Sequence, residues 1–399
     1  MNFSEIQSIE DTLMAKVYAR KPIAISRGMG ANVYDDLGRE YIDCAGGYGT
    51  CIVGHSHPKV AEAISQQAHR LISAHGSTYN ETRAVFLRKL RSIMPPELGR
   101  VYLANSGAEA IECAIKVARK STGRRKIVAM KGAFHGKTHG ALSATWDSKY
   151  RKSFEPLLQD FTHVVYGDVE SAKAAISQDT AAVLVEPIQG EGGVRVPPPD
   201  WVPLLRDLTR DKGALLVADE IQTGFGRTGK MFACEHFRTT PDVLCLGKGI
   251  ASGLPIGITV AAEQVMGSLS LGEHTSTFGG NPVVCAAAAA TIDVLLEERL
   301  VEKANKVGSY FKDNLTSVQK NLRIIRDVRG LGLMLGVEMR FDILQTLQGL
   351  LKRGILALDA GRNILRFLPP LCLQTQQVDS VMLTLKEQLE EEQVAKLPS

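Results

Sequence analysis

The stretch GALLVADEIQTGFGRTGKM, residues 213–231, decides the fold and raises the question of what the chain binds. It opens with an apolar run that ends at Asp219 and the acid after it. A run without polar alternation is typical of a strand buried on both faces of a parallel sheet. Gly224 and, after four further residues, Gly229-Lys230 follow, which is most of a phosphate-binding P-loop.

The P-loop interpretation fails on two counts. The lysine of a P-loop is followed by Ser or Thr, whose hydroxyl ligates Mg²⁺, whereas Met231 stands here. A P-loop also follows directly on its strand and opens a helix, but this strand ends several residues earlier. A second glycine motif, GMGANV at Gly28, lacks both the third glycine and a preceding strand. The acid at the strand end, Asp219, is therefore the more informative residue.

Three more apolar runs surround the opening stretch. KIVAM (126–130), AAVLVEP (181–187) and DVLCLGKG (242–249) read as further buried strands, with helical patterns at 108–120 and 199–212 between them. Alternating strands and helices predict a mostly parallel α/β sheet. Ligands of such sheets bind at the carboxyl ends of the strands.

The two ends of the chain have a different pattern. NVYD and EYID, around Asp36-Leu37-Gly38, predict a hairpin near the N-terminus. Near the C-terminus a long Ala-rich helix (282–298) precedes two strand-like runs that break at Gly330-Leu331-Gly332. We therefore expect a large domain over residues 46–285 and a smaller α+β domain built from residues 1–45 and 286–399.

Composition favours a soluble cytoplasmic protein. Of 399 residues, 44% are hydrophobic and 23% charged, and no apolar run is long enough to span a membrane. The N-terminus has acids and no apolar core of a signal peptide. Seven cysteines without a Cys-x-x-Cys pair indicate reduced thiols rather than disulfides or a metal site.

Positive charge is concentrated in residues 116–152. This segment holds eleven Lys or Arg and one acid, Asp147, so its charge is +10, while the whole chain carries +4. Such a segment is either a solvated helix face or a docking surface for an anionic partner. Nucleic acid is not the expected partner, because no nucleic-acid-binding motif accompanies the charge and aromatic residues are only 6%.

A buried acid and a buried lysine end neighbouring strands. Asp219 needs a cation to offset its burial, and Lys248, at the end of the next apolar run, would have its pKa lowered by desolvation. The two could form a structural ion pair. However, Asn105-Ser106-Gly107-Ala108, between a strand and a helix start, adds an anion site. Phosphate site, acid and reactive lysine are together what pyridoxal 5′-phosphate requires.

The chain resembles the class III (ω-amino acid) aminotransferases, which have PLP-dependent transferase fold type I. The resemblance covers nearly the whole chain and implies a mostly parallel seven-stranded sheet in the large domain. Its motifs occur in the family order: NSGAEA (105–110), GAFHGKT (132–138), EPIQGEGG (186–193), ADEIQTGFGRTGK (218–230), LGKGIASGLPIG (246–257) and STFGGNP (276–282).

The resemblance implies a role for each matching residue. Lys248 would be the Schiff-base lysine that also moves the proton, and Asp219 would keep the pyridine nitrogen protonated. Gln222 would lie near the phenolic oxygen, and Phe134 would stack on the ring. The remaining cofactor-binding residues would be His135 and, around the phosphate, Ser106, Gly107, Ala108 and Thr277. Thr277 would reach over from a second subunit, which implies a homodimer with shared active sites.

Two further residues concern the use of two kinds of substrate. NILRFLPPL (363–371) resembles the segment whose arginine, here Arg366, binds the α-carboxylate of glutamate or 2-oxoglutarate. Glu191 resembles the glutamate that pairs with this arginine and swings away when a dicarboxylate binds. The alternative is a static salt bridge. The glycine-rich turn 223–230 is expected near the substrate entrance or the dimer interface.

Within the family the chain is most similar to the acetylornithine aminotransferase branch, and especially to its archaeal type. Enzymes of that type act in lysine or arginine biosynthesis, on lysine or ornithine that is linked to a small acidic amino-group carrier protein. The basic segment is consistent with such a carrier. Lys137 stands where acetylornithine enzymes have a carboxylate-binding arginine. N-acetylornithine or free ornithine remain alternative substrates; Tyr18 and Tyr48 fall near the tyrosines of ornithine-specific relatives. Transamination of 4-aminobutyrate, an aminomutase and a non-catalytic binding protein are less favoured.

Overall fold

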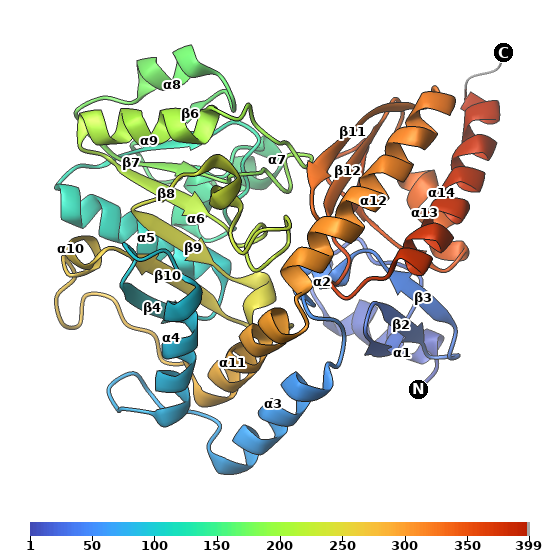
Figure 1. Ribbon diagram of the computed structural model, residues 1–399, viewed down its shortest axis with the longest axis horizontal. Helices are drawn as coiled ribbons and strands as arrows, with labels where there is room; N and C mark the ends of the chain where they lie inside the picture. The colour runs from blue at the N-terminus through green and yellow to red at the C-terminus, as the bar shows by residue number, and fades with distance from the viewer. Residues whose placement is uncertain (397–399) are drawn as a thin grey trace.

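The computed structural model describes residues 1–396 and contains three β-sheets (Figure 1). The largest has seven strands. From edge to edge they are β4 (Arg100–Ala104), β10 (Gly257–Ala261), β9 (Val243–Leu246), β8 (Leu215–Asp219), β7 (Thr180–Val185), β5 (Lys126–Met130) and β6 (Phe161–Val164). Strand β10 runs antiparallel to both of its neighbours, and the pairs from β9 to β6 are parallel. The predicted mostly parallel sheet of seven strands is confirmed.

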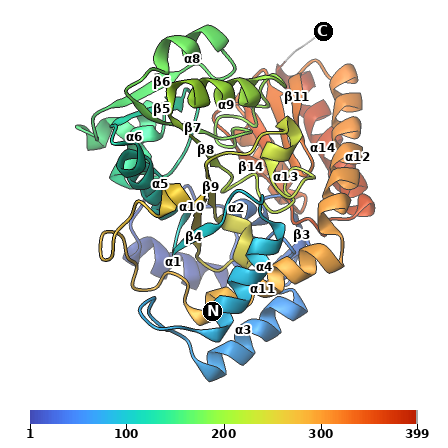
Figure 2. The same ribbon diagram turned by 60° about the vertical axis from the view of Figure 1, so that its left-hand side comes forward.

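Helices cover both faces of this central sheet. Because successive side chains of a strand point to opposite faces, Ile127 and Ala129 of β5 face one helical layer, and Val128 and Met130 face the other. The first layer consists of α5 (Gly107–Thr122), α6 (His139–Ala144) and α10 (Glu263–Met266). The second consists of α8 (Val169–Ala175) and α9 (Trp201–Lys212), at the top of Figures 1 and 2.

Two four-stranded sheets combine the ends of the chain. One has the order β1 (Ile25–Met29), β2 (Asn32–Asp35), β3 (Glu40–Asp43) and β13 (Ile355–Leu356). Strands β2 and β3 form the predicted hairpin, and β3 pairs in parallel with β13, more than 300 residues later. The other has the order β11 (Ile325–Leu331), β12 (Met334–Met339), β15 (Ile364–Phe367) and β14 (Leu358–Asp359). The domain boundaries at residues 45 and 285 stay a prediction.

The remaining helices lie around these sheets. On the right in Figure 1, α12 (Leu300–Asn321) packs against β11 and β12 of the C-terminal sheet, α13 (Leu344–Lys352) contacts β13, and α14 (Thr375–Lys396) packs against both of these helices. The Ala-rich helix α11 (Pro282–Glu297) begins at an Asn281 cap and packs against α3 (Pro58–Arg70) and α4 (Glu81–Ile93). Its small side chains allow this close approach. Short helices are α1 (Phe3–Leu13), α2 (Gly46–Gly49) and α7 (Ser148–Arg151).

The glycine-rich turn 223–230 is buried over most of its length. Its arginine, Arg227, is fully buried and donates to the carbonyl oxygens of Leu333 and Pro369. The placement of this turn near the substrate entrance or the dimer interface stays a prediction. The turn is buried because it packs against the β11–β12 turn, where Gly332 has φ +55°. A Cβ at Gly332 would lie 2.3 Å from the carbonyl carbon of Thr228. The turn thus joins the central sheet to the C-terminal sheet.

Over residues 1–396, no helix is both long and apolar enough to cross a membrane.

Candidate functional site

A cavity of about 260 Å³ lies at the carboxyl ends of strands β7, β8 and β9. Asp219 is the last residue of β8, and Lys248 comes two residues after β9. Gly107, the first residue of α5, also lines the cavity. The cavity therefore occupies the position at which open α/β sheets bind their ligands. Its lining includes Gly107, Ala108, Phe134, His135, Glu186, Glu191, Asp219, Gln222 and Lys248.

Lys248 has the environment of a reactive amine. It begins the 3-10 helix η3 (Lys248–Ala251) with φ +41°, a strained value for a residue with a side chain. Burial lowers the pKa of Lys248 below its usual 10.5, although Glu191 and Asp219 pull in the opposite direction. A larger fraction of this amine is therefore neutral near pH 7 than of an exposed lysine. Neutral lysine is a nucleophile and can take up a proton.

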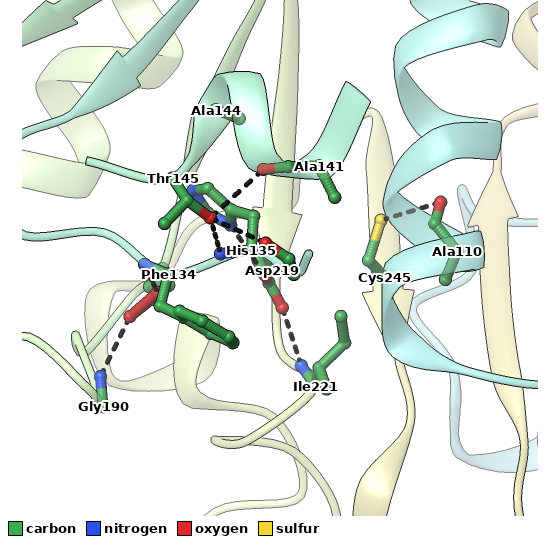
Figure 3. A network of polar contacts seen from close by, with 12 residues as sticks. Ala110, Phe134, His135, Ala141, Ala144, Thr145, Gly190, Asp219, Ile221 and Cys245 are labelled. Carbon is green, nitrogen blue, oxygen red and sulfur yellow. Dashed lines mark hydrogen bonds and ion pairs between the residues drawn. The ribbon is translucent and has the colours of Figure 1, made fainter. Parts of the chain in front are cut away.

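Asp219 is held rigidly beside His135. The Nδ1 of His135 lies 2.7 Å from Oδ2 of Asp219, and the backbone N–H of Ile221 donates to the other carboxylate oxygen at 3.0 Å (Figure 3). Both side chains are buried. The backbone N–H of His135 donates to Oγ1 of Thr145. The carboxylate therefore faces the cavity with its orientation fixed, as required to pair with a cationic ring nitrogen.

The start of α5 is partly free to receive an anion. The backbone N–H groups of Gly107 and Ala108 make no hydrogen bond within residues 1–396, and both residues line the cavity. The Ser106 hydroxyl is already engaged, since it donates to Oε2 of Glu109 at 2.9 Å and accepts from the Glu109 N–H. Of the predicted phosphate contacts, the two backbone groups are thus available. Ser106 would have to exchange its partner.

Glu186 is a cavity residue that the sequence analysis missed. It comes directly after β7 and is buried. Its two carboxylate oxygens accept from the backbone N–H groups of Phe134, at 2.8 Å, and Gly190, at 2.9 Å. Burial raises the pKa of Glu186 above its usual range. The available signal was the same as for Asp219, namely an acid that ends a buried strand.

Arg366 and Glu191 form an ion pair at the edge of the cavity, here called the carboxylate gate. The guanidinium of Arg366, on β15, is fully buried, and its Nη1 lies 2.6 Å from Oε1 of Glu191 and 3.4 Å from Oε1 of Gln222. Burial acts to raise the pKa of Glu191, but the charge and hydrogen bond of Arg366 hold it below the usual value. Nε and Nη2 of Arg366 have no hydrogen-bond partner among residues 1–396.

Ser106 and Arg366 adjoin lining residues without lining the cavity themselves, and four further predicted residues lie apart from it. Tyr18 and Tyr48, 70% and 55% exposed, line a second cavity of about 580 Å³ beside α13. Lys137 is exposed, with Nζ 5.2 Å from the ring centroid of Tyr150. Thr277 is exposed in the segment between α10 and α11. The structure therefore does not bring these four side chains to Lys248 within one chain.

The cavity fits pyridoxal 5′-phosphate. Lys248 and Asp219 lie on its walls, Phe134 offers an aromatic face, and two unpaired N–H groups at the start of α5 suit the phosphate. His135 adds a buried Nε2 that has no partner among residues 1–396. No single one of these features is specific, but together they match the amine, acid and anion sites that this cofactor requires.

Comparisons with known proteins agree with this geometry. The family described as aminotransferase class-III matches residues 13–389. The acetylornithine aminotransferase of Methanopyrus kandleri is 46% identical over 85% of this chain and 86% of its own length. The [LysW]-aminoadipate semialdehyde transaminase of Deinococcus radiodurans is 43% identical over 94% of this chain and 87% of its own. The crystal structure of ornithine aminotransferase from Toxoplasma gondii superposes with a TM-score of 0.95 at 33% identity, covering 99% of this chain and 97% of that one.

Proposed function

The chain belongs to the class III aminotransferases, pyridoxal 5′-phosphate-dependent transaminases, and from that premise we propose the substrates and the residues that act on them. The enzyme transfers the ω-amino group of a lysine or ornithine, whose α-amino group is blocked by an amide to a small acidic carrier protein, to 2-oxoglutarate. The products are the semialdehyde and glutamate. The observation that carries the proposal is the buried Arg366 paired with Glu191 beside Lys248.

The reacting groups are arranged around the cavity. When bound, the cofactor supplies an electron sink for the carbon–hydrogen bond that breaks. Nζ of Lys248 takes the proton from the amine-bearing carbon, which its lowered pKa favours because more of this amine is neutral than in an exposed lysine. Asp219, whose carboxylate is oriented by His135, would pair with the ring nitrogen of the cofactor. Phe134 limits the other face of the cavity.

The carboxylate gate accounts for the use of two substrates. A dicarboxylate places one carboxylate on Arg366, which releases Glu191. An ω-amine substrate presents no carboxylate there, and the guanidinium would remain buried without a counter-ion. An uncompensated buried charge costs about 3–5 kcal/mol. Glu191 removes this cost by pairing with Arg366 at 2.6 Å, so both half-reactions proceed in the same cavity.

The basic segment 116–152 divides into two clusters, and one suits an acidic carrier. The first cluster lies toward the C-terminal end of α5, a helix that is about 24 Å long. In this cluster Lys120 pairs with Glu273, and Lys116 contacts His274. The second part surrounds Tyr150, whose ring is 5.3 Å from that of Phe134 at the cavity. Lys137 and Lys149 lie over this ring, at 5.2 and 4.7 Å from its centroid. We call the exposed Lys137, Lys149 and Lys152 the basic rim.

The names of the relatives support two readings of the blocked substrate, the carrier-linked one and N-acetylornithine. The basic rim favours the carrier, because an acidic protein is steered to a cationic surface. Free ornithine is the third candidate, and a Tyr48 variant would affect it most. Turnover of carrier–lysine, carrier–ornithine, N-acetylornithine and ornithine at low and high salt distinguishes them. A preference for N-acetylornithine that is insensitive to salt would overturn the carrier proposal.

We further propose a homodimer in the cytoplasm, with Thr277 of each subunit completing the phosphate site of the other. In support, Thr277 and its neighbour Phe278 are exposed in the single chain. The mass of the protein in solution tests the dimer.

A further inference from the structure

Glu186 connects two loops that act in different ways on the reaction. Through Oε1 it holds the backbone N–H of Phe134, in the loop that supplies the aromatic wall. Through Oε2 it holds the N–H of Gly190, the residue immediately before Glu191. The proposed function uses neither Glu186 nor Gly190.

Gly190 is fixed from three sides. Its N–H donates to Glu186, and its carbonyl oxygen accepts from the N–H groups of Gly193 at 3.1 Å and Val194 at 3.2 Å. A Cβ on Gly190 would lie 2.1 Å from Oε1 of Gln222, so the backbone passes directly against that side chain. Because these contacts hold the backbone in place, Glu191 leaves Arg366 by rotating its own side chain. Gly190 is therefore the fixed point of the backbone from which the Glu191 side chain moves, and we call it the pivot of the carboxylate gate.

A carboxylate suits this connection better than any neutral side chain. Both oxygens of Glu186 accept from N–H donors, whereas a glutamine would turn an NH₂ group toward one of the two donors. Burial and the nearby Asp219 oppose the charge, whereas His135 and the two backbone N–H groups favour it. Retaining an acid in this position is costly unless the two backbone bonds compensate.

We propose that Glu186 is a positioning residue of the transamination reaction. Glu186 holds the pivot Gly190 in place, so that the carboxylate of Glu191 is correctly placed to pair with Arg366. The inference rests on the proposed function of the gate. Loosening the pivot weakens the hold of Glu191 on Arg366. The half-reaction with the ω-amine substrate, which needs the closed gate, is therefore slowed. A dicarboxylate competes with Glu191 for Arg366. Because Glu191 is then held less firmly, the dicarboxylate binds at least as tightly as it does to the wild type.

The test uses the holoenzyme with Glu186→Gln, and glutarate as an unreactive dicarboxylate probe. We expect the single-turnover rate with the ω-amine substrate to fall about tenfold, as for loss of one hydrogen bond to a charged group. Calorimetry should give a glutarate Kd that is unchanged or lower. If the glutamine variant does not fold, Glu186→Asp replaces it in the test, because aspartate is too short to reach both N–H groups. The same slower ω-amine half-reaction and the same unchanged or lower glutarate Kd are expected.

A matched control is available in Glu220, another buried carboxylate that accepts two backbone N–H groups, those of Ala233 and Cys234, but lies off the cavity. Glu220→Gln should lower the melting temperature without changing the ratio of the two half-reactions. Weaker glutarate binding in Glu186→Gln, or an equal fall of both half-reactions, would overturn the positioning role. If Glu191→Gln leaves glutarate binding unchanged, the gate itself, and with it the proposed function, is wrong.

Discussion

The carboxylate of Glu191 lies 2.6 Å from Nη1 of Arg366, although the two residues are 175 positions apart. Glu191 follows strand β7 of the central sheet, and Arg366 is on β15 of the C-terminal sheet. The gate therefore joins two sheets, and its strength depends on how these sheets are packed together. Because Arg366 is fully buried, its guanidinium takes its counter-charge from whichever carboxylate is present.

Replacing Glu191 with Ala should destabilise the enzyme in a way that a dicarboxylate reverses. The substitution leaves a buried guanidinium without its counter-ion, which costs about 3–5 kcal/mol at most, less where water enters the space. We expect a melting temperature several degrees lower. Added glutarate should restore most of the loss, because it supplies a carboxylate to Arg366.

The matched variant combines Arg366→Met with Glu191→Ala, which removes both charges of the pair and with them the need for compensation. It should melt near the wild-type temperature and should not respond to glutarate. A Glu191→Ala enzyme that melts like the wild type without glutarate would show that the pair is not coupled as described.

Lys248 should capture the cofactor with a pH dependence set by its lowered pKa. The pKa lies below the usual 10.5 because the amine is buried, so the neutral form is available at lower pH than for an exposed lysine. As the pH falls through this pKa the amine becomes charged, and capture should slow. Stopped-flow absorbance of apoenzyme mixed with pyridoxal 5′-phosphate, from pH 6 to 10, measures the midpoint.

Lys248→Ala should lose the covalently held cofactor and all turnover, whereas Lys230→Ala, an exposed lysine of the glycine-rich turn, should keep both. Turnover retained in Lys248→Ala would refute the central assignment.

Asp219→Asn should keep the shape of the site but lose the charge opposite the ring nitrogen. The expected result is a fall in kcat of about 10²–10⁴-fold, the range typical of a group that controls protonation in the transition state. The amide can still accept from the N–H of Ile221, so folding should be preserved. Kinetics and circular dichroism together check both parts. His135→Asn should cost less, because that residue acts through Asp219.

Substitutions in the basic rim should lower turnover only of a carrier-linked substrate. Lys149→Ala with Lys152→Ala should lower kcat/KM for the carrier conjugate about fivefold at low salt and leave N-acetylornithine nearly unchanged. Lys116→Ala with Lys120→Ala removes the same charge from the far end of α5 and is the control. Equal effects of the two double variants would favour net charge rather than a docking surface.

Much of the fold could be predicted from the sequence, because strands buried in a parallel sheet appear in the sequence as apolar runs. The predicted run 126–130 coincides with β5, and the run ending at Asp219 coincides with β8. The contacts of Glu186 could not be predicted, since they depend on the path of two loops that are more than 50 residues apart. Charge along a sequence also cannot tell which end of a helix faces the cavity, so the sequence predicts one basic segment where the structure has two separate clusters.

The last prediction concerns Thr277, which lies outside the cavity of its own chain. If each site takes Lys248 from one subunit and Thr277 from the other, two inactive variants should complement each other. Mixed dimers of Lys248→Ala with Thr277→Ala then contain one site with both native residues and one site with neither. Half of the dimers formed by random exchange are mixed, so activity should recover to about a quarter of the wild type. Without sharing, every site keeps one substitution and mixing adds nothing. Turnover measured before and after subunit exchange therefore decides whether the phosphate site is completed by the partner subunit.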